Sequence, residues 1–121
     1  MNIDALKAAG IDYERGVKRF VGRAHLYEKA LRKFPQDGTF ARMRADYEKN
    51  DLEALLADAH EFKGMCGNIA LPSLFEASDG IVQMLRGGAF SPDALDDAFL
   101  SLARAYEAAR AAILSAWEGA Q

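Results

Sequence analysis

The apolar residues recur at helical spacing over almost the whole chain, and no stretch shows the alternation that is typical of a strand. The longest such pattern covers residues 91–117, where Ser91 and Pro92 are suited to the start of a helix. Apolar residues then follow at steps of three and four: Leu95, Phe99, Leu102, Tyr106, Ala109, Ile113 and Trp117. This spacing predicts one long amphipathic helix.

Two further amphipathic helices are expected before it. The first starts at Asp51, and its apolar residues form a seam along one side: Leu55, Ala59, Phe62, Cys66 and Ile69. The second begins at Pro72 and ends at Gly87 and Gly88. Because only a short joint separates these two helices, we expect them to pack antiparallel.

Shorter helical segments come earlier in the chain, at residues 3–9, after a cap at Asp12, at residues 27–34 before Pro35, and at residues 38–49. The expected fold class is all-α: a four-helix bundle of antiparallel up-down helices with short additional N-terminal helices. Either residues 27–34 or residues 40–47 supply the fourth helix. A length of 121 residues suits a single domain that covers residues 1–121.

The composition narrows the class of protein. The net charge is −3 and no basic block occurs, so nucleic acid is not an expected partner. The single cysteine, Cys66, cannot form an internal disulfide, and neither a signal peptide nor a long apolar run is present. We therefore expect a cytoplasmic protein without a membrane segment, and a monomer, because one bundle can close its own core.

The segment HEFKGMCGN, residues 60–68, carries the candidate chemistry. The centre of the apolar seam lies about 140° around the helix from His60, so this side chain should face water. Its neighbours on that face are Ala57, Lys63, Gly64 and Gly67. Since glycine destabilises a helix interior by about 1 kcal/mol relative to alanine, the two glycines need an explanation.

Bare backbone on this face would let a bulky partner reach the imidazole. Close approach of a neighbouring helix also selects glycine, but Gly64 and Gly67 lie on the face turned away from the seam. Lys63 is one turn from His60 and is suited to hold an anion, such as a phosphoryl group bound to the imidazole. A neutral imidazole is a nucleophile at physiological pH.

These residues carry a family likeness. The run His60, Lys63, Gly64, Gly67, Asn68 and Ile69 resembles the H-x-x-K-G-x-x-x-N-[IL] motif of histidine phosphotransfer (HPt) domains in multistep two-component phosphorelays. The resemblance implies that His60 accepts a phosphoryl group from a receiver aspartate, or from a kinase, and passes it to another receiver aspartate. Lys63 would interact with the phosphoryl oxygens, Gly64 and Gly67 would keep the surface open, and Asn68 would help to fix the local helix geometry.

One departure concerns the next turn. Many members of the family have glycine after the N-[IL] pair, whereas this chain has Ala70. This difference affects the turn into the following helix and leaves the histidine untouched.

The resemblance also implies which proteins bind this chain and which of them holds the metal ion. Receiver domains and a sensor or hybrid histidine kinase are the expected partners, and Mg²⁺ is expected on the receiver rather than on this chain. Gln83 and Arg86 of the facing helix are candidates to reach the phosphoryl group, depending on the helix register. Leu52, Leu56 and Ala57 lie toward His60 and are expected to form part of the docking surface.

Other functions remain open at this point. HEFK also resembles the phosphoacceptor box of histidine kinase dimerisation modules, but Gly64 and Met65 follow where a threonine and a proline are usual. A bundle that docks on a receiver or kinase without being phosphorylated is the main alternative. His25 has no ligand partner at suitable spacing and Cys66 lies on the seam, so we expect no metal site and a phosphocarrier rather than an autonomous kinase.

Overall fold

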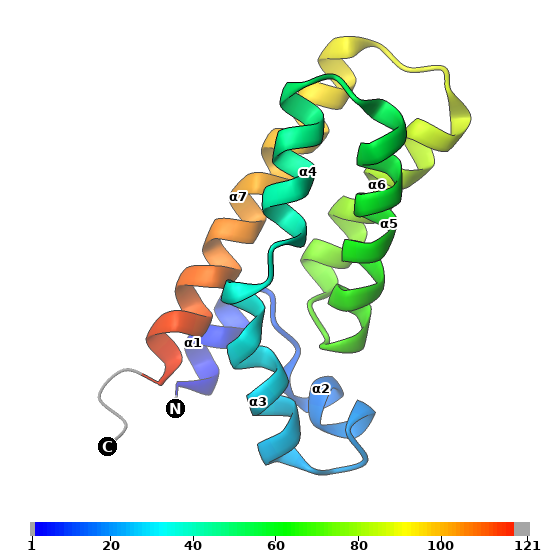
Figure 1. Cartoon of the computed structure of the whole chain (residues 1–121). Coiled ribbons are helices and arrows are strands. Elements are labelled where there is room, and N and C mark those ends of the chain that lie inside the picture. The colour runs from blue at the N-terminus through cyan, green and yellow to red at the C-terminus, as the bar shows by residue number, and fades with distance from the viewer. Residues whose placement is uncertain (1, 118–121) are drawn as a thin grey trace.

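The computed structural model describes residues 2–117 (Figure 1). Within this range the chain forms seven α-helices and one short 3₁₀ turn, without strands. The elements are α1 (Ile3–Ala8), α2 (Tyr13–Arg19), α3 (Ala24–Lys33), η1 (Phe34–Gln36), α4 (Thr39–Glu48), α5 (Leu52–Asn68), α6 (Pro72–Gly87) and α7 (Pro92–Ala116). The predicted all-α fold class is confirmed. No helix in residues 2–117 has the length and apolar character needed to cross a membrane.

Helix ends fall close to the residues that the sequence marks. Asp51 caps α5 because its carboxylate accepts a hydrogen bond from the backbone N–H of Ala54, at 3.1 Å. Gly88 ends α6 in the left-handed conformation, with a φ of +70°. The end of α3 differs from the expectation, because the chain continues through Pro35 as η1 instead of leaving the helical conformation. Proline fits there because its fixed φ suits the first turn of a helix.

Helices α4 to α7 enclose the main core (Figure 1). Helix α5 packs against α4 and α6, and α6 packs against α7. Aromatic side chains join α4 to α7: Phe40 stacks on Tyr106 with ring centroids 4.1 Å apart, and Tyr47 stacks on Phe99 at 4.3 Å. Each of the helices α5, α6 and α7 runs antiparallel to the helix before it (Figure 1), because the connections between them are short. Of the two segments considered for the fourth helix, α4 packs against α5, whereas α3 contacts α7.

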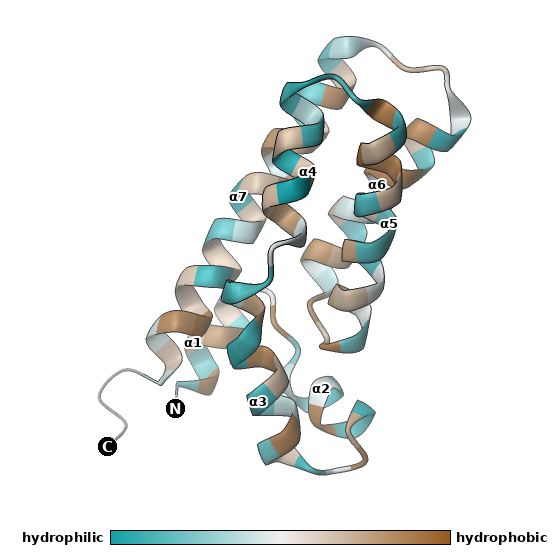
Figure 2. Cartoon of the chain, in the orientation of Figure 1, coloured by the Kyte–Doolittle hydropathy of each residue, from teal (hydrophilic) through white to brown (hydrophobic). Residues whose placement is uncertain are grey.

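Helix α5 turns one side fully inward. Leu55, Ala59, Phe62 and Cys66 have no exposed surface, and Ile69 is also buried. Burial raises the pKa of the Cys66 thiol, so this cysteine is a packing residue and not a nucleophile. Figure 2 shows that the other long helices also alternate between apolar and polar residues.

The N-terminal helices support the turn between α5 and α6. Tyr27 of α3 is fully buried, and its hydroxyl donates a hydrogen bond to the carbonyl oxygen of Ile69, at 2.9 Å. The backbone N–H of Asp12 donates to the carbonyl oxygen of Ala70, at 3.0 Å. Ala70 has a φ of +57°, a left-handed conformation for which glycine is better suited. The turn that precedes α6 therefore has a left-handed residue at position 70, although this residue is alanine and not glycine.

Close packing against Tyr27 explains the glycine within α2. A Cβ atom at Gly16 would lie 2.1 to 2.5 Å from three carbons of the Tyr27 ring. No side chain fits between this backbone and the ring, so α2 approaches α3 only because residue 16 is glycine.

We predict that Gly16→Ala lowers the free energy of unfolding by about 3 kcal/mol, because the added methyl group displaces a buried ring. Gly80 is the matched control: it lies on the exposed side of α6, and a Cβ there would meet nothing within 4 Å. Gly80→Ala should raise the free energy of unfolding by about 1 kcal/mol. Urea denaturation followed by circular dichroism measures both values, and a loss of the same size in both variants would contradict the packing account.

Candidate functional site

His60 lies on the exposed side of α5, as the helical pattern predicts. The preceding residue, Ala59, lies on the inward side of the helix and is fully buried. The Nδ1 atom of His60 lies 3.4 Å from Nη2 of Arg86, which comes from α6. Within residues 2–117, no hydrogen bond involves Nε2 of the same ring. Nε2 therefore has no hydrogen-bonding partner among these residues.

The two glycines beside His60 have different surroundings. Gly64 is exposed, and an added Cβ atom would meet nothing within 4 Å. An added Cβ atom at Gly67 would lie 3.3 Å from the ring of Phe75 in α6. Gly64 therefore lies on an open surface. Gly67 also allows a side chain of the neighbouring helix to approach, although its face is turned away from the apolar seam.

Lys63 is engaged with α6. Its Nζ atom lies 3.0 Å from Oδ1 of Asp79, and 5.8 Å from the centre of the Phe75 ring. The side chain of Lys63 is only 20% exposed, so contacts from several sides restrain it. Hydrogen bonds, first from Lys63 and then from Gln83, hold the pKa of the Asp79 carboxyl below its ordinary value. Sequence reasoning did not identify Asp79.

The two candidates on α6 have separate roles. Gln83 donates a hydrogen bond from Nε2 to Oδ1 of Asp79, at 3.3 Å, whereas Arg86 contacts His60. Asp79, Gln83 and Arg86 are spaced four and three residues apart, so all three lie on the face of α6 that meets α5. This spacing is the signal by which Asp79 could have been found.

Asn68 links α5 to α2. Its Oδ1 atom accepts a hydrogen bond from Nη2 of Arg19, at 3.2 Å, and its side chain is exposed. A role for Asn68 within the last turn of α5 remains a prediction. In the structure, the Asn68 side chain contacts a different helix, α2.

The three residues that we assigned to docking differ in exposure. Ala57 is exposed, whereas Leu52 and Leu56 are half-buried and pack against the core. The exposed apolar area on this side of His60 is therefore smaller than expected. The reason is that the buried side of α5 is broader than the seam itself.

A groove of about 520 Å³ lies toward the other end of α5. Gly64 and Gly67 contribute to its lining, together with Phe75, which is 37% exposed. Arg15 and Arg19 of α2 also line it. Since Gly64 is one helical turn from His60, this groove continues the open face that carries the histidine.

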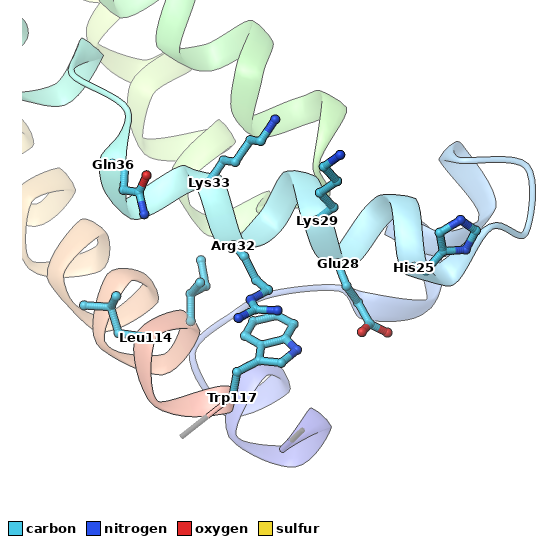
Figure 3. Close-up of a pocket in the computed structure, with 9 residues that line it drawn as sticks. His25, Glu28, Lys29, Arg32, Lys33, Gln36, Leu114 and Trp117 are labelled. Carbon is cyan, nitrogen blue, oxygen red and sulfur yellow. The ribbon is translucent and has the colours of Figure 1, made fainter. Parts of the chain in front are cut away.

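A cavity of about 570 Å³ lies elsewhere, between α3 and α7 (Figure 3). The Arg32 guanidinium lies over the Trp117 ring there, 5.1 Å from its centre, and Lys29 and Lys33 come from the same helix. His60 lines neither this cavity nor the groove. An open imidazole on a helix face suits a macromolecular partner better than an enclosed small molecule.

The described residues offer no cluster for a metal ion. Within residues 2–117, no group of three or more His, Cys, Asp or Glu side chains is arranged to hold one. The site therefore consists of one imidazole, two nearby cations and a carboxylate.

Comparison with known protein families identifies the class of this site. A family model for the Hpt domain matches residues 19–112, which include His60, Lys63, Asp79 and Arg86. Neither the curated proteins nor the solved structures give a match. Hpt domains are phosphocarrier modules, not kinases; they act in two-component phosphorelays and interact with receiver and kinase partners. Since the match covers most of the sequence, this chain belongs to the Hpt domain family.

Proposed function

We propose that this chain carries a phosphoryl group on His60 and exchanges it with aspartates of receiver domains in the cytoplasm, or receives it from a histidine kinase. The observation that carries the proposal is the exposed imidazole of His60 beside the bare backbone of Gly64. Such a face lets a second protein bring a phosphorus atom close to Nε2 without passing a side chain at position 64.

The transfer step follows from the chemistry of imidazole. In the attacking tautomer Nδ1 carries the proton, and the lone pair of Nε2 attacks the phosphorus of the partner's aspartyl phosphate. The N–P bond forms while the P–O bond to the aspartyl group breaks, and the carboxylate leaves with the electron pair. The ring then releases its Nδ1 proton to water. The reverse sequence passes the phosphoryl group to a second receiver.

Arg86 responds to the protonation of the ring. A guanidinium has only donors, so it can hydrogen-bond to Nδ1 only when that nitrogen has no proton. During attack through Nε2, Arg86 therefore turns away, which is easy because the 3.4 Å contact is long and the side chain is exposed. It is then free to contact the phosphoryl oxygens. After proton release Arg86 can return to Nδ1.

The chain supplies the nucleophile and positions it, and the partner supplies the phosphoryl group and the metal ion. Phosphoryl transfer depends mainly on alignment and on neutralisation of charge. We propose that Lys63 and Arg86 contribute cations on this side and that the receiver holds Mg²⁺ on the other. We further propose that the partner docks over Ala57 and Gly64, with Leu52 and Leu56 as the apolar edge.

The direct test is phosphoryl transfer from a phosphorylated receiver domain. Intact mass analysis should show one acid-labile phosphoryl group on the parent chain and none on His60→Ala. If several receivers and a kinase fail to label the folded parent chain but still bind it, the chain acts as a docking module without phosphorylation.

The open surface at Gly64 makes a separate prediction. Gly64→Ala should raise the free energy of unfolding by about 1 kcal/mol, because alanine favours the helix and its methyl group meets nothing. Gly64→Phe should slow transfer from a receiver at least tenfold, yet leave phosphorylation by phosphoramidate unchanged, because that reagent is small. Ala111→Phe, at an exposed position on α7, is the control for added bulk. Equal slowing with both phosphoryl donors would rule out a steric role.

The position of the docking surface is tested by charge. Ala57→Glu should weaken binding of a receiver about tenfold in titration calorimetry, because a charge would be buried beneath the partner. Ala108→Glu on α7 is exposed and should leave the affinity unchanged. A partner that lies instead over the groove would be weakened by Phe75→Ala and not by Ala57→Glu.

A further inference from the structure

One carboxylate lies among the cations of the site. Oδ1 of Asp79 accepts hydrogen bonds from Nζ of Lys63 at 3.0 Å and from Nε2 of Gln83 at 3.3 Å. Arg86 follows on the same face of α6, and its charge acts on Asp79 as well. Lys63 is thus paired with an acid before any phosphoryl group is present.

This pairing limits what Lys63 can offer. A lysine has a single charge, and a carboxylate 3.0 Å away neutralises much of its field toward other anions. A phosphoryl group on His60, one helical turn from Lys63, would have to share the ammonium group with Asp79. Asp79 would also repel the phosphoryl oxygens, because both carry negative charge.

The surroundings keep this arrangement in place. The ring of Phe75 lies beside the Lys63 ammonium group at 5.8 Å, and the Lys63 side chain is largely covered. Gln83 holds the same carboxylate oxygen from one turn further along α6. These contacts therefore restrain the Lys63 side chain between the two helices.

We propose that Asp79 is a positioning residue that holds Lys63 on α6 and weakens its attraction for the phosphoryl group on His60. The inference rests on the proposed function, which makes His60 the phosphorylated residue. Its consequence is that the phosphoryl group is held loosely enough to leave again. A carrier in a relay needs this property, because it must donate as readily as it accepts.

The test uses the full chain phosphorylated by phosphoramidate, so it does not depend on a receiver. The second ionisation of the phosphoryl group is followed by ³¹P NMR as a function of pH. In Asp79→Asn, Lys63 is free to pair with the phosphoryl oxygens, so the midpoint should fall by about 0.3 pH unit. In a Lys63→Gln background, the same Asp79→Asn change should move the midpoint by less than half as much.

A matched control separates this effect from a general change in charge. Glu61 is next to His60 in the chain but pairs with Arg42, at 2.8 Å, and not with Lys63. Glu61→Gln should therefore shift the midpoint less than Asp79→Asn does. An unchanged or raised midpoint in Asp79→Asn, or an equal shift in the Lys63→Gln background, would overturn the proposal.

Transfer to a receiver gives a second and independent result. At equilibrium with a phosphorylated receiver, Asp79→Asn should raise the phosphorylated fraction of this chain relative to the receiver, changing the equilibrium constant about twofold to fivefold. An equilibrium constant that stays the same or falls would contradict the proposal. If the chain charged by phosphoramidate never donates to a receiver, the proposed function fails, whereas the pH midpoint still decides the role of Asp79.

Discussion

Burial of one side of α5 determines the direction of every functional side chain on that helix. Leu55, Ala59, Phe62 and Cys66 have no exposed surface, so a rotation of α5 would expose apolar area and bury polar groups. His60 is turned outward because these four residues are turned inward. The C-terminal end of α5 is held as well, since the Tyr27 hydroxyl donates a hydrogen bond to the carbonyl oxygen of Ile69.

The neighbouring helix α6 completes the site by supplying charge. It brings Arg86 to the imidazole and Asp79 to Lys63, so that His60 and Lys63 each contact a side chain of the neighbouring helix. Neither contact requires a deep pocket. The exposed part of α5 can therefore remain flat and accessible while the charges around it are already arranged.

Much of this arrangement follows from the sequence. Helical periodicity alone predicts that His60 is exposed, because the side of a helix is determined by spacing. The pairing of Arg86 with His60 and of Lys63 with Asp79 could not be predicted, since a shift of one residue rotates a helical side chain by about 100° and only packing decides the register between two helices. The spacing of Asp79 from Gln83 and Arg86 places the three residues on one face of α6, but it does not indicate that Asp79 pairs with Lys63 of the other helix. The contact of Gly67 with Phe75 also depends on how closely α5 and α6 approach.

The central claim concerns one atom, Nε2 of His60. Phosphorus–nitrogen correlation NMR on the ¹⁵N-labelled chain, after transfer from a phosphorylated receiver, reports directly which nitrogen carries the phosphoryl group. We expect a single phosphorus signal that is coupled to Nε2 of His60. A signal coupled to His25, coupling to Nδ1 of His60, or a phosphoryl group without coupling to nitrogen would contradict the claim.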